Sequence, residues 1–192
     1  MMNNHLQVAF ITGRSRPNNW SLSPVQTTFL QKIVGAHQQV MMNFPWTVQT
    51  TPWTTTGLLR ASINNTREYF GSRSANFALR YRQQTINMLT SANHTLLLSG
   101  SCGLELFNQL HLEPALLKRV SIFAYGPVAR QRPSCQHLLV QGKQDWISRC
   151  WFRHADMRID CGHMNYLEQP QLLSLCNQFI EDLVVKCSAY TT

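Results

Sequence analysis

Short apolar runs that alternate with helical patterns are the feature that most restricts the fold of this 192-residue chain. Six segments are predicted to be strands; the apolar run 6–12, for example, ends at Gly13 as a buried strand does. The predicted strands span residues 6–12, 39–44, 94–99, 119–125, 137–142 and 156–160. Strands that alternate with helices predict an α/β fold, in which a mostly parallel sheet of about six strands carries helices on both faces.

Helical patterns fill most of the segments between the predicted strands. They span residues 24–36, 58–89 with a break near Gly71, 102–112, 146–154 and 170–186. Apolar residues in these segments recur at helical spacing, and Pro24 and Gly35 stand near the two ends of the first one. We find no internal repeat and no low-complexity linker, so residues 1–192 are expected to form one domain.

The charge and cysteine content of the chain indicate which partners it attracts and in which compartment it is expected. Seventeen Lys and Arg against nine Asp and Glu give a formal net charge of +8, which attracts anionic partners. None of the six cysteines stands in a CxxC pair, so a zinc ribbon or a thioredoxin-like motif is not expected. The sequence shows neither a secretory signal nor an apolar stretch long enough to span a membrane, and a cytoplasmic location with reduced thiols is predicted.

Small and chemically useful residues gather just after the predicted strands. Gly13, the segment 99–103, Gly142 and Gly162 all fall at or just after the end of a predicted strand. The carboxyl ends of parallel strands meet at one edge of the sheet, and ligands bind there in open α/β folds. We therefore expect the functional residues at this edge.

The segment Ser99-Gly100-Ser101-Cys102-Gly103 joins the third predicted strand to a helical pattern. Small residues around a central serine suit a sharp strand-to-helix turn that presents the serine hydroxyl above the sheet. An ordinary tight turn would also use these residue types. Ser99 and Cys102 are rival nucleophiles by residue type, but only Ser101 is central in the pattern.

An acid and a histidine follow two later predicted strands, after Ser101 in the chain. Asp145 follows the fifth predicted strand in "VQGKQD", and His163 follows the sixth in "DCGHMNYLEQP". Serine, acid and histidine stand in the order found in the catalytic triads of α/β hydrolases. The sequence resembles the α/β-hydrolase superfamily of serine hydrolases, at separate motifs over nearly the whole chain.

The resemblance implies a role for each matching residue. Ser101 would be the nucleophile, His163 the general base, and Asp145 the acid that orients the imidazole. The backbone N–H groups of Cys102 and of Arg14, or a neighbour of Arg14, would form the oxyanion hole. No metal ion and no organic cofactor is implied.

Some positions depart from the family pattern or carry a second interpretation. Thr12 stands where many members have a histidine before Gly13. Asp145 also suits a helix N-cap, and the two roles are compatible. Asp156 and Asp160 are alternative acids, but both lie too near His163 in sequence to match the family layout.

The resemblance also predicts a lidless form of the fold. Only residues 126–136 separate the fourth and fifth predicted strands, which leaves no room for the cap domain that many members insert there. Residues 44–75 would then shape the mouth of the site. Phe44, Trp46, Trp53 and Tyr69 are the candidates for an acyl pocket, and ordinary packing beneath a long loop is the equally weighted alternative.

These observations predict a serine hydrolase that cleaves a carboxylic ester or thioester through an acyl-enzyme. The acyl donor would be a small molecule or an acyl group on an acidic acyl carrier protein or coenzyme A, as the positive charge suggests. The alternatives are a non-catalytic binding module on a hydrolase fold and a basic surface that binds a membrane or nucleic acid. Because no nucleic-acid-binding motif is present, nucleic acid is not the expected partner.

Overall fold

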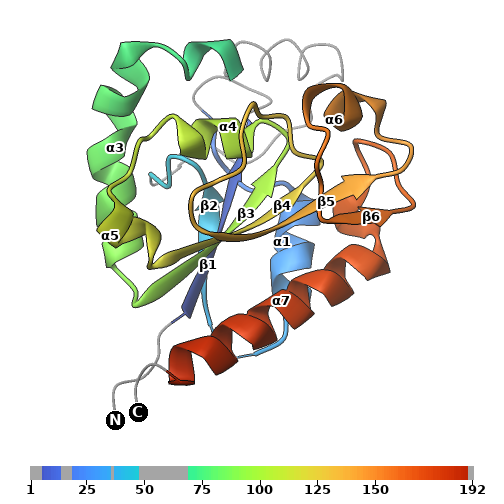
Figure 1. The fold of residues 1–192 in the computed structure, drawn as a ribbon. Coiled ribbons are helices and arrows are strands. Elements are labelled where there is room, and N and C mark those ends of the chain that lie inside the picture. The colour runs from blue at the N-terminus through green and yellow to red at the C-terminus, as the bar shows by residue number, and fades with distance from the viewer. Residues whose placement is uncertain (1–5, 14–18, 36, 48–68, 190–192) are drawn as a thin grey trace.

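The computed structural model describes residues 6–13, 19–35, 37–47 and 69–189, and its centre is a six-stranded sheet (Figure 1). The strands are β1 (Leu6–Thr12), β2 (Gln38–Asn43), β3 (His94–Gly100), β4 (Val120–Tyr125), β5 (Gln136–Gly142) and β6 (Met157–Ile159). All neighbouring strands pair in parallel, in the order β2-β1-β3-β4-β5-β6. The predicted α/β fold class is confirmed.

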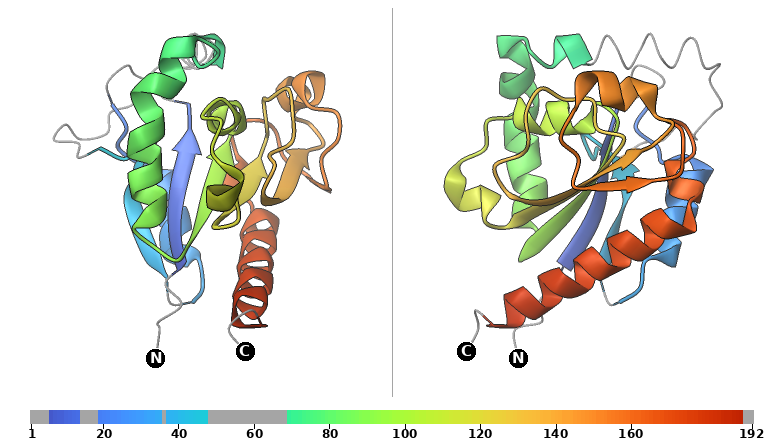
Figure 2. Two further views of the ribbon diagram at one scale, coloured as in Figure 1. Left: turned by 60° about the vertical axis from the view of Figure 1, so that its left-hand side comes forward. Right: turned by 45° about the vertical axis from the view of Figure 1, so that its right-hand side comes forward.

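Helices cover both faces of this sheet. They are α1 (Pro24–Lys32), α3 (Ala75–Thr90), α4 (Gly103–Asn108), α5 (Pro114–Leu117), α6 (Trp146–Trp151) and α7 (Pro170–Ala189), with a 3-10 turn η1 (Tyr166–Glu168). Figure 2 shows α3 and α7 on opposite sides of the sheet. The alternation of side chains along β3 explains this, because Leu96 and Leu98 join a core with α1 and α7, whereas Leu97 joins a core with α3 and α4.

Local sequence sets the helix ends, and two predicted ends were wrong. Helix α1 begins with a capping box in which Ser23 and Gln26 each bond the other's backbone N–H. It ends at Lys32 instead of residue 36, because Ile33 already has extended backbone. The predicted helix 102–112 is only α4, because the chain turns through His111 with a positive φ of 47° before α5 begins at Pro114.

The predicted helix 58–89 lies partly outside the described residues. Its described part has a turn over residues 72–74, close to the expected break at Gly71, and α3 follows from Ala75. Residues 126–135, which connect β4 to β5, contain neither a helix nor an inserted domain. This connection agrees with the prediction of no cap domain at that position.

The strand order reverses direction at β1, between β2 and β3. From β1 the chain passes to β2 on one side, and β3 then pairs with β1 on the other side. Such a reversal separates the connecting loops at the carboxyl ends of β1 and β3, where α/β sheets commonly bind ligands. Residue 101 follows β3 at this point, and residues 145 and 163 follow β5 and β6 at the same edge.

Candidate active site

Ser101 occupies a strained turn between β3 and α4. Its φ is 52°, in the left-handed region that residues other than glycine rarely adopt. The Ser101 N–H donates to the Tyr125 carbonyl at 3.3 Å, and the Ser101 carbonyl accepts from the Val128 N–H at 2.9 Å. These bonds to the end of β4 hold the turn, and such strain is common where a side chain must be presented for chemistry.

The small neighbours of Ser101 are required by close approaches. A Cβ at Gly103 would lie 1.9 Å from the Ile11 carbonyl oxygen, so only glycine lets α4 start this close to β1. A Cβ at Gly100 would lie 2.6 Å from the Tyr125 ring. Of the three rival nucleophiles, Ser99 and Cys102 are buried, whereas Ser101 is only partly buried.

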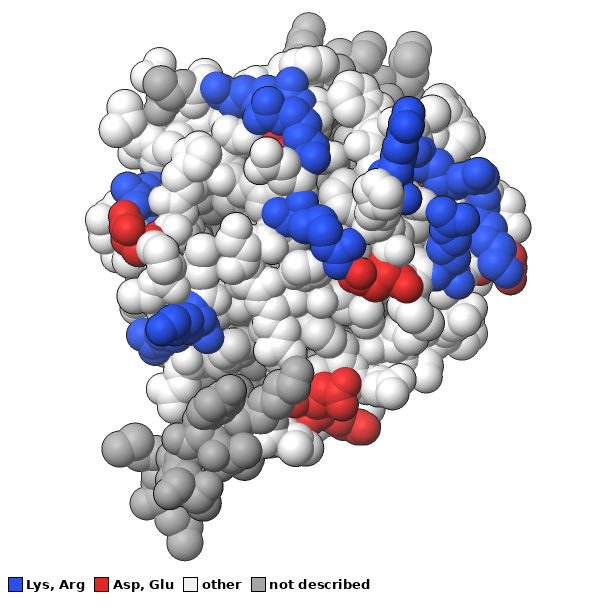
Figure 3. All heavy atoms as spheres, viewed as in Figure 1, with Lys and Arg blue, Asp and Glu red and all other residues white. Residues whose placement is uncertain are grey.

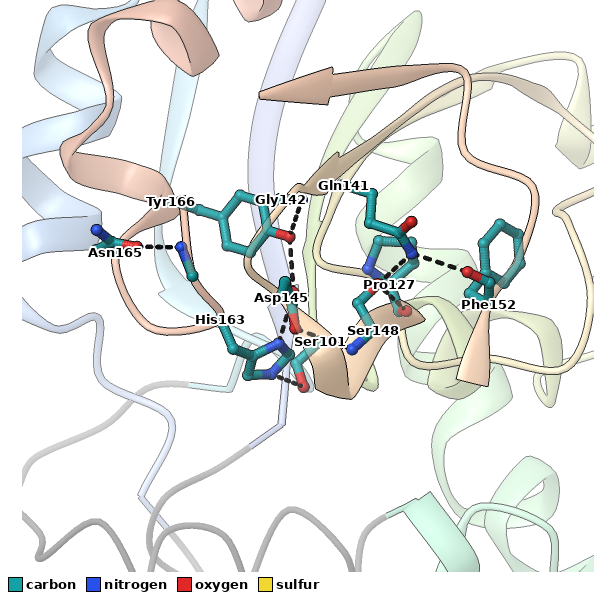
Figure 4. Close-up of polar contacts among 11 residues, drawn as sticks. Ser101, Pro127, Gln141, Gly142, Asp145, Ser148, Phe152, His163, Asn165 and Tyr166 are labelled. Atoms are coloured by element: carbon teal, nitrogen blue, oxygen red, sulfur yellow. Dashed lines mark hydrogen bonds and ion pairs between the residues drawn. The ribbon is translucent and has the colours of Figure 1, made fainter. Parts of the chain in front are cut away.

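His163 lies between Ser101 and Asp145 (Figure 4). Its Nε2 is 3.2 Å from Ser101 Oγ, and its Nδ1 is 2.8 Å from Asp145 Oδ2. An ionised carboxylate only accepts hydrogen bonds, so Nδ1 carries a proton and Nε2 is left to accept one from the serine hydroxyl. The loop that holds the imidazole is closed by the Gly162 N–H, which donates to Asn165 Oδ1 at 3.0 Å.

Asp145 is fully buried and fills both roles that the sequence left open. Its Oδ1 accepts from the Ser148 N–H at 2.9 Å and caps α6, while Oδ2 accepts from His163. Burial by itself raises the pKa of Asp145, but hydrogen bonds from His163, the Ser148 N–H and Tyr166 outweigh it and hold the pKa below its ordinary value. Asp145 is therefore a carboxylate at neutral pH.

The two alternative acids are engaged elsewhere. Asp156 accepts from the Leu139 N–H at 2.9 Å and pairs with Arg132, and Asp160 pairs with Lys143 at 2.9 Å. These three contacts join the two carboxylates to β5 and to the residues before and after it. The structure thus brings Asp145, and neither alternative, to His163.

Tyr166 is a member of this cluster that sequence reasoning missed. Its hydroxyl donates to Asp145 Oδ2 at 2.7 Å and accepts from the Gly142 N–H at 2.5 Å. Gly126, with a φ of 55°, leaves the space, since a Cβ there would lie 2.7 Å from the Tyr166 ring and 3.0 Å from Asp145 Oδ2. Burial and the neighbouring carboxylate raise the pKa of Tyr166, so the hydroxyl keeps its proton for Asp145.

A second buried network fixes the helix that carries Asp145. Ser148 Oγ donates to the Pro127 carbonyl at 2.8 Å and accepts from Gln141 Nε2 at 3.0 Å. The same Gln141 amide donates to the Phe152 carbonyl at 2.8 Å (Figure 4). Gln141 and Ser148 are almost fully buried, so α6 is fastened at both ends to β5 and to the loop after β4.

Glu105 is a second feature that the sequence did not reveal. It lies on α4, one turn after the Ser101 elbow, and is 1% exposed. Its Oε1 pairs with Arg73 Nε at 3.3 Å and with Arg130 Nε at 3.1 Å, and its Oε2 accepts from the Arg130 N–H at 3.0 Å. A buried carboxylate needs such partners, and these tie the segments around residues 73 and 130 to the elbow helix.

The residues predicted for the oxyanion hole are only partly described. Cys102 follows Ser101 and stands at the N-cap position of α4, whereas Arg14 lies outside the described residues. At the end of β1, the Thr12 N–H donates to Asn43 Oδ1 at 2.9 Å, and Asn43 Nδ2 donates to the Thr12 carbonyl at 3.1 Å. The side chain of Asn43 thus anchors the point where the chain leaves β1.

The four residues suggested for an acyl pocket separate into different environments. Phe44 and Trp46 belong to the core on the α3 side of the sheet, and Trp46 Nε1 donates to the Phe10 carbonyl at 2.9 Å. This is the packing alternative, and we assign no substrate contact to these two buried rings. Tyr69 packs against Cys102 beside the elbow, while Trp53 lies outside the described residues.

Comparison of the chain with known protein families found no match, and comparison with curated proteins found none either. Within the described ranges, no group of three or more His, Cys, Asp or Glu side chains is placed to hold a metal ion. Among those same residues, no helix combines the length and the apolar composition needed to cross a bilayer.

The geometry permits one kind of chemistry directly. A serine hydroxyl beside an imidazole, which in turn donates to a buried carboxylate, can lose its proton to the imidazole as it attacks an electrophile. The distances of 3.2 Å and 2.8 Å are within reach of proton transfer.

Proposed function

We propose that this protein is a serine hydrolase of the α/β-hydrolase type that cleaves a carboxylic ester or thioester. One observation carries the proposal: the continuous contact from Ser101 Oγ through His163 to the buried carboxylate of Asp145. The three residues come from three separate strand ends, in the chain order of that superfamily. The parallel sheet and the positive φ of Ser101 support the same proposal.

In the proposed reaction, Ser101 Oγ attacks the carbonyl carbon while its proton moves to His163 Nε2. The tetrahedral intermediate collapses as the imidazolium gives this proton to the leaving alcohol or thiol, and an acyl-serine remains. Water then attacks the acyl carbon and loses a proton to His163, which returns it to Ser101 Oγ as the acid departs. Asp145 stays ionised and stabilises the imidazolium in both halves of the cycle.

The oxyanion of each tetrahedral intermediate needs hydrogen-bond donors. We propose the backbone N–H of Cys102 as one donor and an N–H at or beside Arg14 as the other, from their positions after β3 and β1. Loss of one such donor typically costs ~3 kcal/mol of transition-state stabilisation. The acyl donor fits this site as an ester or as a thioester, since both react at a carbonyl carbon.

A fluorophosphonate probe tests the proposal directly, because it labels a serine only when that serine is activated. The probe should label the wild-type chain at Ser101, and Ser101→Ala should remove the label. Ser99→Ala is the matched control and should keep it. An ester and thioester panel then separates the two substrate types. A folded wild-type protein that takes up no label would overturn the hydrolase proposal and favour a non-catalytic binding module.

A further inference from the structure

Four large apolar side chains are exposed around the proposed site. Trp146 and Met164 are each 72% exposed, Phe70 is 54% exposed and Trp151 is 49% exposed. Trp146 directly follows Asp145 in the chain, and Met164 directly follows His163. Single exposed apolar residues are ordinary on protein surfaces, but a group beside one site marks an interaction surface. We call these four residues the apolar rim.

The apolar rim is joined to the elbow by Tyr69. The Tyr69 ring centroid lies 5.3 Å from that of Phe70 and 5.1 Å from that of Trp151. Tyr69 also packs against Cys102, the residue after Ser101, and Ile147 of α6 lies against the same cluster. Phe70 and Trp151 therefore rest on the same support as the proposed nucleophile.

Cations surround the apolar rim on the side of α6 and β6. Figure 3 shows Lys and Arg side chains gathered over these elements. Lys143, Arg149, Arg153 and Arg158 are all exposed there. Lys143 pairs with Asp160, but within the described part of the chain Arg149, Arg153 and Arg158 form no ion pair with a carboxylate. This face therefore carries an uncompensated positive charge beside exposed tryptophans.

We propose that this face docks on an anionic lipid surface. Tryptophan and arginine together are typical of surfaces that lie in the headgroup layer, where rings enter the acyl boundary and guanidinium groups meet lipid phosphates. An acidic soluble partner would explain the cations, but it would not require exposed apolar side chains such as Trp146 and Met164 next to Asp145 and His163 in the chain. The lipid surface accounts for both. Docking is a binding property and does not depend on the proposed hydrolysis.

Vesicle co-sedimentation with the full-length Ser101→Ala protein tests docking without any turnover. We expect binding to phosphatidylcholine vesicles that contain phosphatidylserine, and much weaker binding to pure phosphatidylcholine. Added salt should weaken the binding, because it screens the attraction between Arg149 or Arg153 and the lipid. Equal binding to both vesicle types would overturn the anionic-surface proposal.

Variants of the apolar rim and of the cations test its two components separately. Trp146→Ser should weaken vesicle binding about tenfold, as expected for one lost buried ring. Val185→Ser, which also removes a 69% exposed apolar side chain but from the far end of α7, should leave it unchanged. Arg149→Gln should weaken binding about fivefold. Lys118→Gln, an exposed cation after α5, is the matched control for charge.

Three results would overturn docking while the hydrolase proposal stands or falls by its own labelling experiment. They are no vesicle binding by the folded protein, unchanged binding by Trp146→Ser, and equal losses in Trp146→Ser and Val185→Ser. Binding of a soluble acidic acyl carrier protein, weakened by Arg149→Gln, with no binding to vesicles would replace the lipid surface by a carrier protein. Circular dichroism of each variant shows that the fold is kept.

Discussion

The carboxyl ends of β5 and β6 differ sharply from those of β1 and β2, although all four lie at the same edge of the sheet. After β5 and β6, two polar side chains converge on one buried carboxylate, as His163 and Tyr166 both donate to Asp145. At the ends of β1 and β2, the side-chain amide of Asn43 forms hydrogen bonds with the backbone of Thr12, and aromatic rings pack in the core. One end is built for polar chemistry and the other for packing.

The two pairs of strand ends show that a buried charge and a buried aromatic ring make different demands on their neighbours. Burial of a charge such as Asp145 is tolerated only when hydrogen-bond partners lie in fixed positions. The residues around a buried polar cluster must therefore hold those partners in place. An aromatic ring gains free energy from burial against any well-shaped apolar surface. Phe44 accordingly packs at 5.2 Å from Trp46 and from Tyr81, between ring centroids, and adds nothing to the polar cluster.

The largest expected effect comes from removing the reactive pair. Ser101→Ala and His163→Ala should each lower kcat/KM for an active ester about 10⁴-fold or more, because triad members act as one unit. The double variant should be little worse than either single variant. Initial-rate kinetics measure this, and multiplied losses in the double variant would show that the two residues act separately.

On the packing side, Phe44→Ala should destabilise the fold by about 3–5 kcal/mol, since it leaves a cavity in the core. Urea unfolding followed by circular dichroism measures the free energy. Phe70→Ala removes a half-exposed ring and should cost less than about 1 kcal/mol. If Phe44→Ala instead left stability intact and changed acyl-chain preference, the ring would line a pocket and the contrast between the two strand ends would fail.

Gly126→Ala tests how closely the backbone packs against Tyr166 and Asp145. Positive φ and contact with the Tyr166 ring should together cost about 1–3 kcal/mol of folding free energy, and kcat/KM should fall as Asp145 is displaced. Gly71→Ala is the matched control, because no atom lies within 4 Å of a Cβ built there. Urea midpoints that fall equally in both variants would contradict the close packing at Gly126.

The smallest expected effect on turnover, within about tenfold, comes from Tyr166→Phe, which removes one donor from Asp145. The variant should also lose about 1–3 kcal/mol of stability at neutral pH, because the Gly142 N–H is left unpaired. Initial-rate kinetics and urea unfolding measure these two effects. Unchanged kcat/KM together with unchanged stability would show that the hydroxyl serves neither Asp145 nor the Gly142 N–H.

The same variant has a signature in stability against pH. The pKa of Asp145 is lowered in the folded protein, so the carboxylate contributes stability above its unfolded pKa of about 3.9. This contribution is lost as pH falls through the lower folded value. Urea unfolding at several pH values below about 5 should show a shallower acid loss for Tyr166→Phe than for the wild-type chain, because the pKa of Asp145 returns toward its unfolded value.

The strands and the shared position of Ser101, Asp145 and His163 at one edge of the sheet were predictable because their signals are local. Each predicted strand agrees with an observed one to within a residue at either end. At β1, for example, the apolar run 6–12 and the glycine after it mark the strand. Ser101, Asp145 and His163 follow three of these strands, and parallel pairing then places them at one edge. Their distances were not predictable, because register and loop shape set them.

Other residues escaped prediction because their roles depend on distant parts of the chain. Tyr166 stands three residues after His163, and that spacing is the only signal in its favour. What turns its hydroxyl toward Asp145 is the space left by Gly126, at the end of another strand. Glu105 is one acid within the predicted helix 102–112, and its burial makes sense only with Arg73 and Arg130 beside it. Sequence alone does not pair such residues.

The proposed base, His163, follows the short strand β6, which is held by fewer backbone hydrogen bonds than β3, the strand before the proposed nucleophile Ser101. Met157–Ile159 pair with β5 alone at the border of the sheet, whereas β3 has neighbours on both sides. Border strands with few backbone bonds open at a lower free energy than central ones, so amide hydrogens there should exchange with solvent sooner than those of Leu96–Leu98. Each such opening would carry His163 away from Ser101 while the centre of the sheet stays folded. Mild denaturant should therefore abolish the proposed hydrolytic activity reversibly, at concentrations below those that unfold the core.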